Sequence, residues 1–500
     1  MTVEPTTGSL RPKAARGVLQ MIVLSVIGTA LARVAQFILP LFLLPSDFGL
    51  FALATFFMGL LSLFADLGLS TGLVSKREGF DTAANTAFTL RLLTTSSLFA
   101  SSVGVGWIAS RLYGQPELNL LIIVLSLGLF FQAFTMVPRV TASRAMLFGR
   151  ASIPDNFGKW VGVVLAIGLA ILGFGYWSLL YGAITGTAIG GVSQVAWSLL
   201  REPKWRPRLA FDPAIARSLM RFGQFVMLAG FANYIAHSID NAIVGYVLGI
   251  APLGYYSFAY SWGVYLTSNL TSVLSPVGYP VMASVARTQD RLRRALSENI
   301  RYFSYVAACL TFGVLTFASV FVRSFYGRQW EPSILPMQLL APVGILIGYS
   351  AICGDALYAL GKSRTVFVTT WVEVLVLVLM LLPATIYLGL AGTSGAALLG
   401  GIVVLLLAGR YANRATGMSL SDWRGAVQYS LVAGVIASGV GVGLTVAFPS
   451  SVLALLAEGS VFIGVYVATL QILTRGVFLA DLRHALLLGM RRREGEERIP

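Results

Sequence analysis

Residues 17–44 read GVLQMIVLSVIGTALARVAQFILPLFLL, an apolar run that follows a polar stretch at residues 1–16. A helix needs about 20 such residues to cross roughly 30 Å of hydrocarbon, at about 1.5 Å per residue. The apolar core of a signal peptide has only about 7 to 15 residues, so we expect no cleavage here. The run therefore predicts a retained transmembrane helix.

Similar runs recur along the chain and are separated by short polar segments. They are continuous and rich in Gly, Leu and Ala, whereas strands of a membrane barrel alternate over about 10 residues. The chain is 56% hydrophobic and 11% charged, with a mean hydropathy of +0.78, which is too apolar for a soluble domain. We expect an all-α polytopic membrane protein with 14 transmembrane helices, near residues 17–44, 48–73, 86–110, 118–138, 153–173, 176–200, 222–249, 255–282, 302–322, 333–360, 366–388, 393–410, 426–448 and 453–474.

The 36 Lys and Arg residues are distributed unevenly about these spans. Thirty lie in segments on one side, three lie on the other, and Arg33, Arg91 and Lys159 lie within spans. Because cytoplasmic segments carry an excess of Lys and Arg, this distribution predicts a cytoplasmic location for both termini. The net charge of +15 is then explained by membrane orientation, and we expect no nucleic-acid partner.

Two short motifs occur twice in the same order, which favours an internal duplication. Phe48-Gly49-Leu50 is matched by Leu253-Gly254-Tyr255, and Leu147-Phe148-Gly149-Arg150 by Ala359-Leu360-Gly361-Lys362. We therefore expect two pseudo-symmetric lobes of six helices plus two C-terminal helices. The predicted division is a cytoplasmic tail at 1–16, an N-lobe at 17–200, a linker at 201–221, a C-lobe at 222–410, two further helices with their preceding loop at 411–474, and a cytoplasmic tail at 475–500.

Polar residues form stripes on three predicted spans. An ionised side chain in the bilayer is costly unless it faces a partner or a wet cavity, so such residues are the first candidates for a function. If the two lobes face each other, the stripes line one central cavity. They comprise Ser25, Thr29, Arg33, Gln36 and Pro40 on the first span, Asn233, His237, Asp240 and Asn241 on the seventh, and Ser261, Tyr265, Asn269, Ser272 and Pro276 on the eighth.

Further charged residues lie nearer the predicted cytoplasmic ends of spans, namely Asp66, Arg91, Lys159, Asp355 and Glu373. They are candidates for substrate binding or for coupling to a proton or ion, but snorkelling and a simple ion pair remain open alternatives. His237 near Asp240 is either a proton-responsive pair or an anchor between helices.

Several chemistries lack their sequence signature. The chain has no G-x-x-x-x-G-K-[ST] motif, which argues against an ATP-driven pump. It has only two His and two Cys residues, so we expect no metal site and no disulfide framework. We therefore expect a protein that is not an enzyme and has no cofactor, apart from a coupling H⁺ or Na⁺.

The segments Leu44–Ala52 and Phe64–Val74 resemble the amino-terminal signature of the polysaccharide-transporter branch of the multidrug/oligosaccharidyl-lipid/polysaccharide (MOP) exporter superfamily. The segments Leu253–Ser257 and Phe325–Pro332 are similar to its later landmarks. The resemblance implies a MOP fold and a flippase of the bacterial inner membrane. This flippase would move polyprenyl-diphosphate-linked oligosaccharides to the periplasmic leaflet by alternating access, for exopolysaccharide or O-antigen synthesis.

The resemblance also implies a cationic cavity for the anionic headgroup, and Arg33, Arg91 and Lys159 are the candidates by position. Expected partners are the lipid-linked substrate, membrane lipids, a polysaccharide polymerase and a chain-length regulator. Three alternatives stay open: an ion-coupled multidrug efflux pump, which usually has twelve spans and an acidic cavity, a lipid II flippase, and a structural subunit of a polysaccharide synthase.

Overall fold

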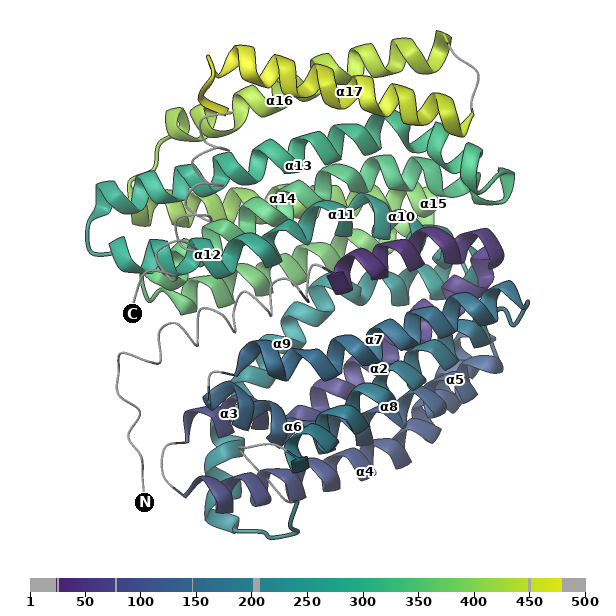
Figure 1. Cartoon of the computed structure of the whole chain (residues 1–500), viewed down its shortest axis with the longest axis vertical. Coiled ribbons are helices and arrows are strands. Elements are labelled where there is room, and N and C mark those ends of the chain that lie inside the picture. Colours follow the sequence, from purple (N-terminus) through teal and green to yellow (C-terminus); the bar gives the residue numbers. More distant parts are fainter. Residues whose placement is uncertain are drawn as a thin grey trace. The chain divides into compact units, whose positions relative to one another are not determined.

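The computed structural model describes residues 24, 27–76, 79–145, 147–200, 207–447 and 451–478, which form helices joined by short turns (Figure 1). No strand occurs in these ranges, and the prediction of an all-α protein is confirmed. Contacts divide the chain into two compact units, Met1–Gly254 (unit 1) and Tyr255–Pro500 (unit 2), and each is described by itself. Ser25, which the sequence places in a polar stripe, lies outside the described residues.

Unit 1 is a bundle of helices that pack on one another through small residues. Its helices are Ile27–Phe42, α2 (Pro45–Asp66), α3 (Leu69–Ser75), α4 (Phe80–Tyr113), α5 (Glu117–Ser126), α6 (Gly128–Arg144), α7 (Phe148–Ile171), α8 (Tyr176–Leu200) and α9 (Pro213–Val247). Helix α2 begins at Pro45, and the Asp47 carboxylate accepts a hydrogen bond from the Leu44 amide at 3.0 Å. Both features are typical of a helix start, so the sequence ends the first span sharply.

The two glycines that align in the predicted duplication lie against each other in unit 1. A Cβ added at Gly49 would overlap the carbonyl oxygen of Ile250, and one added at Gly254 would overlap that of Pro45. Only glycine lets the backbones approach this closely. The shared motif therefore has a packing role in the first turns of α2 and of α10 (Ile250–Gly263).

Helix α9 packs on α2, α3 and α4 of unit 1. The predicted second lobe begins at residue 222, whereas the contacts assign residues up to Gly254, and therefore α9, to unit 1. The predicted lobe division at 201–221 stays a prediction.

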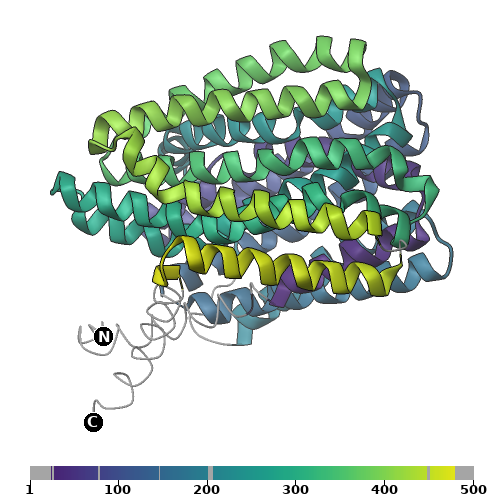
Figure 2. The same ribbon diagram turned by 90° about the horizontal axis from the view of Figure 1, so that it is seen from above.

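Unit 2 contains the remaining helices, several of which run side by side (Figure 2). After α10 these are α11 (Tyr265–Ser268), α12 (Leu270–Val285), α13 (Gln289–Phe325), the 3₁₀ helix η1 (Arg328–Ser333), α14 (Ile334–Ala359), α15 (Ser363–Thr416), α16 (Leu420–Ala447) and α17 (Val452–Leu473). The expected span 255–282 is broken into α10, α11 and α12. The expected spans 366–388 and 393–410 are continuous as α15 except at Gly389, whose φ of 59° and ψ of −141° favour glycine.

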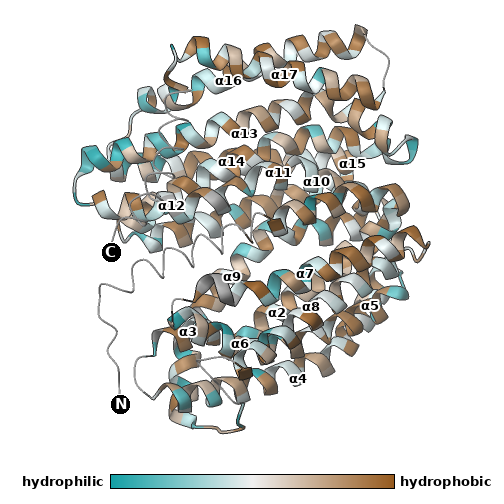
Figure 3. Cartoon of the chain, in the orientation of Figure 1, coloured by the Kyte–Doolittle hydropathy of each residue, from teal (hydrophilic) through white to brown (hydrophobic). Residues whose placement is uncertain are grey.

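The surface of these helices is that of a membrane protein. Within the described ranges, nine helical segments are long and apolar enough to cross a bilayer, and Ile27–Phe42 is a shorter apolar helix. Apolar residues cover the helix faces, and polar residues gather at ends such as the α12–α13 turn (Figure 3). Because contiguous apolar surface of this extent needs a lipid environment, the chain is a multi-pass membrane protein. The count of fourteen spans stays a prediction.

Candidate functional site

Unit 1 encloses a cavity of about 540 Å³ between the helix Ile27–Phe42 and helices α2, α6, α7 and α8. One part of its wall is apolar, where Leu39, Ala166 and Leu179 belong to a buried cluster. The other part is polar. Its polar lining residues are Gln132, Thr135 and Arg139 from α6, Asp155, Lys159 and Trp160 from α7, and Thr187 from α8.

The cavity exists because glycines line the α7 and α8 side of it. Gly158 and Gly162 of α7 face Gly182, Gly186 and Gly190 of α8, so that the two backbones approach closely. A Cβ at Gly158 would overlap the carbonyl oxygen of Gly186. Small residues are common where membrane helices pack closely. The same glycines project no side chains into the neighbouring cavity.

Three charged groups lie at the polar part of this cavity. Arg139 Nη2 donates to Asp155 Oδ1 at 2.7 Å, and the two side chains are 47% and 27% exposed. Lys159 follows Asp155 by one helical turn on α7 and is exposed. It forms no hydrogen bond or ion pair with any residue that the structure describes. The cavity wall therefore carries one more positive than negative charge.

The second predicted cation, Arg91, is deeply buried beside Asp66. Arg91 Nη1 lies 3.5 Å from Asp66 Oδ1, and the Arg91 side chain is only 4% exposed. Asp66 also accepts a hydrogen bond from the Ser70 hydroxyl at 2.6 Å. Arg139 is near enough to Arg91 to repel it electrostatically. The ion pair that the sequence left open as an alternative is thus the geometry observed for Arg91 and Asp66.

Arg33 is half-buried and donates from Nη1 to Gln36 Oε1 at 2.7 Å along its own helix. The residues of this helix that line the unit 1 cavity are Gly28, Leu31, Ala32, Ala35 and Leu39, and Arg33 is not among them. Thr29 is exposed. The predicted role of Arg33, Thr29 and Gln36 in a central cavity stays a prediction.

The polar stripe of α9 is also in unit 1. Nδ1 of His237 lies 2.9 Å from the carbonyl oxygen of Asn233, and Asp240 Oδ1 accepts from the Asn241 amide at 2.9 Å. Asp240 is buried, Asn233 is exposed, and no ion pair joins His237 to Asp240 in the described part of the chain. The predicted roles of Asn233, His237 and Asp240 in a cavity or in coupling stay predictions.

The predicted residues of unit 2 lie on separate helices. Tyr265 and Asn269 are exposed at the breaks between α10, α11 and α12. Asp355 of α14 is half-buried and lies near the Ser275 side chain of α12. Glu373 of α15 is also half-buried. The predicted cavity role of Tyr265 and Asn269 stays a prediction, and so does the predicted coupling role of Asp355 and Glu373.

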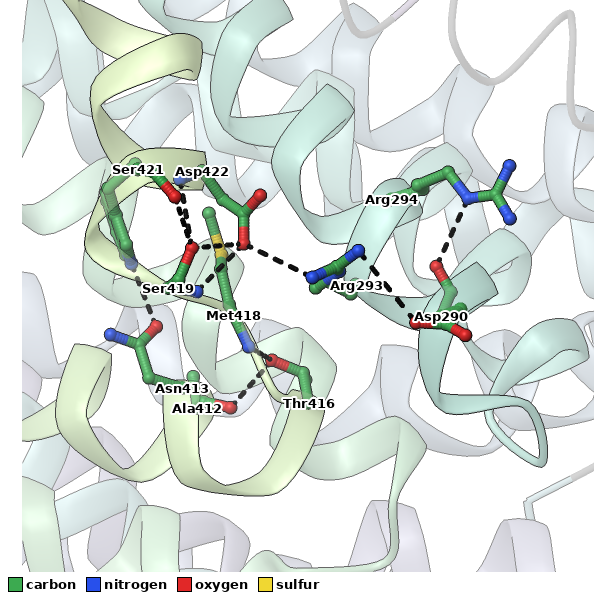
Figure 4. Close-up of polar contacts among 11 residues, drawn as sticks. Asp290, Arg293, Arg294, Ala412, Asn413, Thr416, Met418, Ser419, Ser421 and Asp422 are labelled. Carbon is green, nitrogen blue, oxygen red and sulfur yellow. Dashed lines mark hydrogen bonds and ion pairs between the residues drawn. The ribbon is translucent and has the colours of Figure 1, made fainter.

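Unit 2 also contains a polar cluster that joins α13 to the turn between α15 and α16 (Figure 4). Arg293 of α13 lies 3.9 Å from both Asp290 and Asp422. The Ser419 amide donates to Asp422 at 2.8 Å, and the Asp422 amide to the Ser419 hydroxyl at 3.3 Å. These two reciprocal bonds form a capping box at the start of α16, so the cluster has a structural explanation.

Three candidate site residues were not predicted from the sequence, namely Asp155, Arg139 and Glu458. An Asp four residues before a Lys in an apolar run was a signal for Asp155, whereas Arg139 was counted only as an orientation charge. Glu458 is 4% exposed on α17, and its Oε2 has no hydrogen-bond partner among the residues that the structure describes. It is a carboxylate within a predicted span and could have been found by the same argument as Asp355.

No group of three or more His, Cys, Asp or Glu side chains comes together within the described ranges. At the unit 1 cavity, the charged residues are the Arg139–Asp155 pair and Lys159, two cations and one carboxylate. Such an arrangement suits the binding of an anion by exposed cations more than the binding of a metal ion.

Comparison with solved structures identifies the fold. The lipid II flippase MurJ, in an inward closed conformation, aligns with a TM-score of 0.76 at 14% identity, covering 91% of this chain and 100% of that chain. An inward-facing multidrug resistance MATE family transporter of the MOP superfamily aligns with a TM-score of 0.61 at 19% identity, covering 81% and 99%. The chain is therefore a multi-pass membrane protein with the fold of the MOP transporters.

Residues 38–335 match the family described as polysaccharide biosynthesis protein, and the chain belongs to this family. It is 27% identical over 326 residues to the succinoglycan biosynthesis transport protein ExoT of Rhizobium meliloti, covering 64% of each protein. It is 22% identical over 311 residues to the teichuronic acid biosynthesis protein TuaB of Bacillus subtilis, covering 60% of this chain and 62% of TuaB. The matched part thus spans somewhat less than two thirds of these relatives.

A third relative is the lipopolysaccharide biosynthesis protein WzxC of Escherichia coli, which is 23% identical over 373 residues and is covered over 71% of its length. The family resemblance predicted from the motifs at Leu44–Ala52 and Phe64–Val74 is confirmed.

Proposed function

We propose that this protein is a flippase, and not an enzyme, that moves polyprenyl-diphosphate-linked oligosaccharides from the cytoplasmic to the periplasmic leaflet of the bacterial inner membrane. The product would serve exopolysaccharide or O-antigen synthesis. Family membership supports the proposal, as do the names of relatives in succinoglycan transport and lipopolysaccharide biosynthesis.

The observation that carries the proposal is the positively charged cavity in the apolar bundle of unit 1. A diphosphate that leaves water needs fixed cations near it, because an unpaired charge in a medium of low dielectric is destabilised by several kcal/mol. Lys159 supplies a cation without a partner among the described residues, and Arg139 supplies a guanidinium that binds phosphate oxygens well. Gln132, Thr135 and Thr187 add neutral groups for the hydrogen bonds that sugar hydroxyls make.

The orientation and the partners extend this proposal. The distribution of Lys and Arg supports cytoplasmic termini. A polymerase and a chain-length regulator would take up the flipped repeat unit on the periplasmic side. A coupling H⁺ or Na⁺ would bind at Asp240, Asp355 or Glu373, and neutralising the coupling residue should change how flipping depends on membrane potential or on the pH gradient.

Flipping by the purified protein in liposomes tests the function. The substrate is a polyprenyl-diphosphate oligosaccharide with a fluorophore that a membrane-impermeant reductant quenches only in the outer leaflet. Faster loss of the protected fluorescence than in protein-free liposomes supports the proposal. Labelled lipid II and a cationic dye are run in parallel, and movement of either one in place of the oligosaccharide would assign the protein to lipid II flipping or to drug efflux instead.

A further inference from the structure

The charges along the inner helices of unit 1 are unequal in number and in accessibility. Arg91 is paired with Asp66, and Arg139 is paired with Asp155, which leaves Lys159 without a counter-ion among the described residues. The Arg91–Asp66 pair is inaccessible to a ligand because the Arg91 side chain is only 4% exposed. The second pair can be reached from the cavity because Arg139 is 47% exposed and Asp155 is 27% exposed.

Asp155 has two cations within its reach and pairs with one of them. Asp155 and Lys159 are four residues apart on α7, a spacing at which an acidic and a basic side chain commonly pair on a helix. The Asp155 carboxylate instead accepts from Arg139 of α6 at 2.7 Å. A charge-assisted bond this short occupies the guanidinium edge that a phosphate would otherwise bind. The Asp155 carboxylate therefore occupies the position on Arg139 at which the phosphate of a ligand would bind.

The other elements around the cavity contribute no competing charge. The helix Ile27–Phe42 lines it with Gly28, Leu31, Ala32, Ala35 and Leu39, and α8 lines it with apolar residues, glycines and Thr187. Among the residues that line this cavity, Arg139, Asp155 and Lys159 are the charged ones. An anion that enters thus meets one unpaired ammonium and one guanidinium that already has a carboxylate partner.

We propose that Asp155 is an exchangeable counter-ion of Arg139. A diphosphate headgroup displaces the Asp155 carboxylate from Arg139 when it binds, and the Arg139–Asp155 ion pair forms again when the headgroup leaves. This inference rests on the proposed function and names the residues that receive the headgroup. Lys159 binds one phosphoryl group, and Arg139 binds the other. By competing for Arg139, Asp155 weakens binding and speeds release, which a transporter needs in order to turn over.

Replacing Asp155 with Asn separates this role from a structural one, because the amide keeps the shape and removes the charge. Binding of inorganic diphosphate is measured by calorimetry on the protein in nanodiscs of zwitterionic lipid. Since an ion pair at this exposure contributes up to about 1 kcal/mol, Asp155→Asn should tighten diphosphate binding about fivefold. The same variant should flip the lipid-linked oligosaccharide more slowly, because release is slower. Unchanged affinity in a folded Asp155→Asn protein overturns the proposal.

Lys159→Gln is the second variant, because Lys159 has no partner among the described residues and its loss leaves the Arg139–Asp155 pair intact. It should weaken diphosphate binding by about fivefold, and wild-type affinity in this variant also overturns the proposal. Matched controls are Asp81→Asn at the exposed start of α4 and Lys362→Gln at the exposed turn before α15, which should both bind like wild type.

Two further comparisons complete the test. The first distinguishes a diphosphate site from a site for bulk lipid headgroups, and the second distinguishes failure of the Asp155 exchange from failure of the proposed flippase function. Nanodiscs that contain phosphatidylglycerol should bind diphosphate as tightly as zwitterionic ones, and competition by that lipid would assign the site to bulk headgroups and overturn the inference. If the wild-type protein flips the substrate but Asp155→Asn does not change diphosphate affinity, the flippase function is supported and the Asp155 exchange is refuted. Tighter diphosphate binding in Asp155→Asn with no wild-type flipping supports the anion site and refutes the flippase.

Discussion

The Arg91–Asp66 pair should respond unequally to the loss of its two partners. Asp66→Ala leaves the Arg91 guanidinium buried, 4% exposed, with Arg139 near enough to repel it. Breaking a buried pair in this way destabilises a protein by about 3 to 5 kcal/mol. Arg91→Leu leaves Asp66 35% exposed and still hydrogen-bonded to Ser70 at 2.6 Å, so that its expected cost is about 1 to 2 kcal/mol. The expected difference is therefore about 2 kcal/mol.

Equilibrium unfolding in mixed micelles by titration with dodecyl sulfate, followed by tryptophan fluorescence, measures this difference. The double variant should be more stable than Asp66→Ala alone, because it removes the buried charge together with its partner. Arg111→Leu, at the exposed end of the same helix α4, is the matched control and should change the free energy of unfolding by less than about 0.5 kcal/mol.

Equal destabilisation by Asp66→Ala and Arg91→Leu would refute this reasoning, because burial would then not decide the cost. A second refuting result is an Arg91→Leu protein that keeps wild-type stability but no longer flips substrate. In that case Arg91 would contact the substrate, as its intramembrane position first predicted, and its pairing with Asp66 would not be structural.

Two further predictions rest on packing and ion-pair contacts, and a third rests on the position of Arg33 within the first predicted span. Gly254→Ala should destabilise unit 1 by about 3 kcal/mol, because the added methyl group overlaps the Pro45 carbonyl, whereas Gly104→Ala, with nothing within 4 Å, should be neutral or slightly stabilising in the same unfolding titration. Asp422→Ala removes both the capping box of α16 and the ion pair to Arg293, and should lower the unfolding free energy by about 1 to 2 kcal/mol, more than Arg293→Ala does. Arg33→Ala should abolish polysaccharide export in a complementation assay at an unchanged protein level in the membrane, and normal export would contradict a role in the substrate path.

The helical membrane fold could be predicted because its determinants are local. Hydrophobic length defines each apolar run, and Pro45 and Asp47 end the first one within the sequence itself. The break at Gly389 falls in the predicted gap between the spans 366–388 and 393–410, but the positive φ of Gly389 and the division of 255–282 into three helices were not predicted. Glycine is frequent in membrane helices, so its identity alone does not say which glycine adopts a positive φ.

The candidate site was predicted less completely, because pairing depends on which helices are neighbours. Sequence position identified Arg91, Asp66 and Lys159 as intramembrane charges but gave no partner for any of them. Arg139 was counted with the orientation charges since it follows an apolar run, yet the packing of α6 near α7 brings it to Asp155. A contact between residues on different helices depends on helix packing, which hydrophobic length does not specify.

A binding site for an anion in an apolar bundle must be stable when it is empty as well as when it is filled. An uncompensated cation in such surroundings is destabilised by several kcal/mol, so the empty site needs internal carboxylates. A carboxylate that is never displaced would also exclude the ligand. Asp66 and Asp155 differ in this respect, because Arg91 is 4% exposed and Arg139 is 47% exposed. The first pair therefore fixes α2 to α4, and the second, at the cavity wall, is the one that an incoming anion can open.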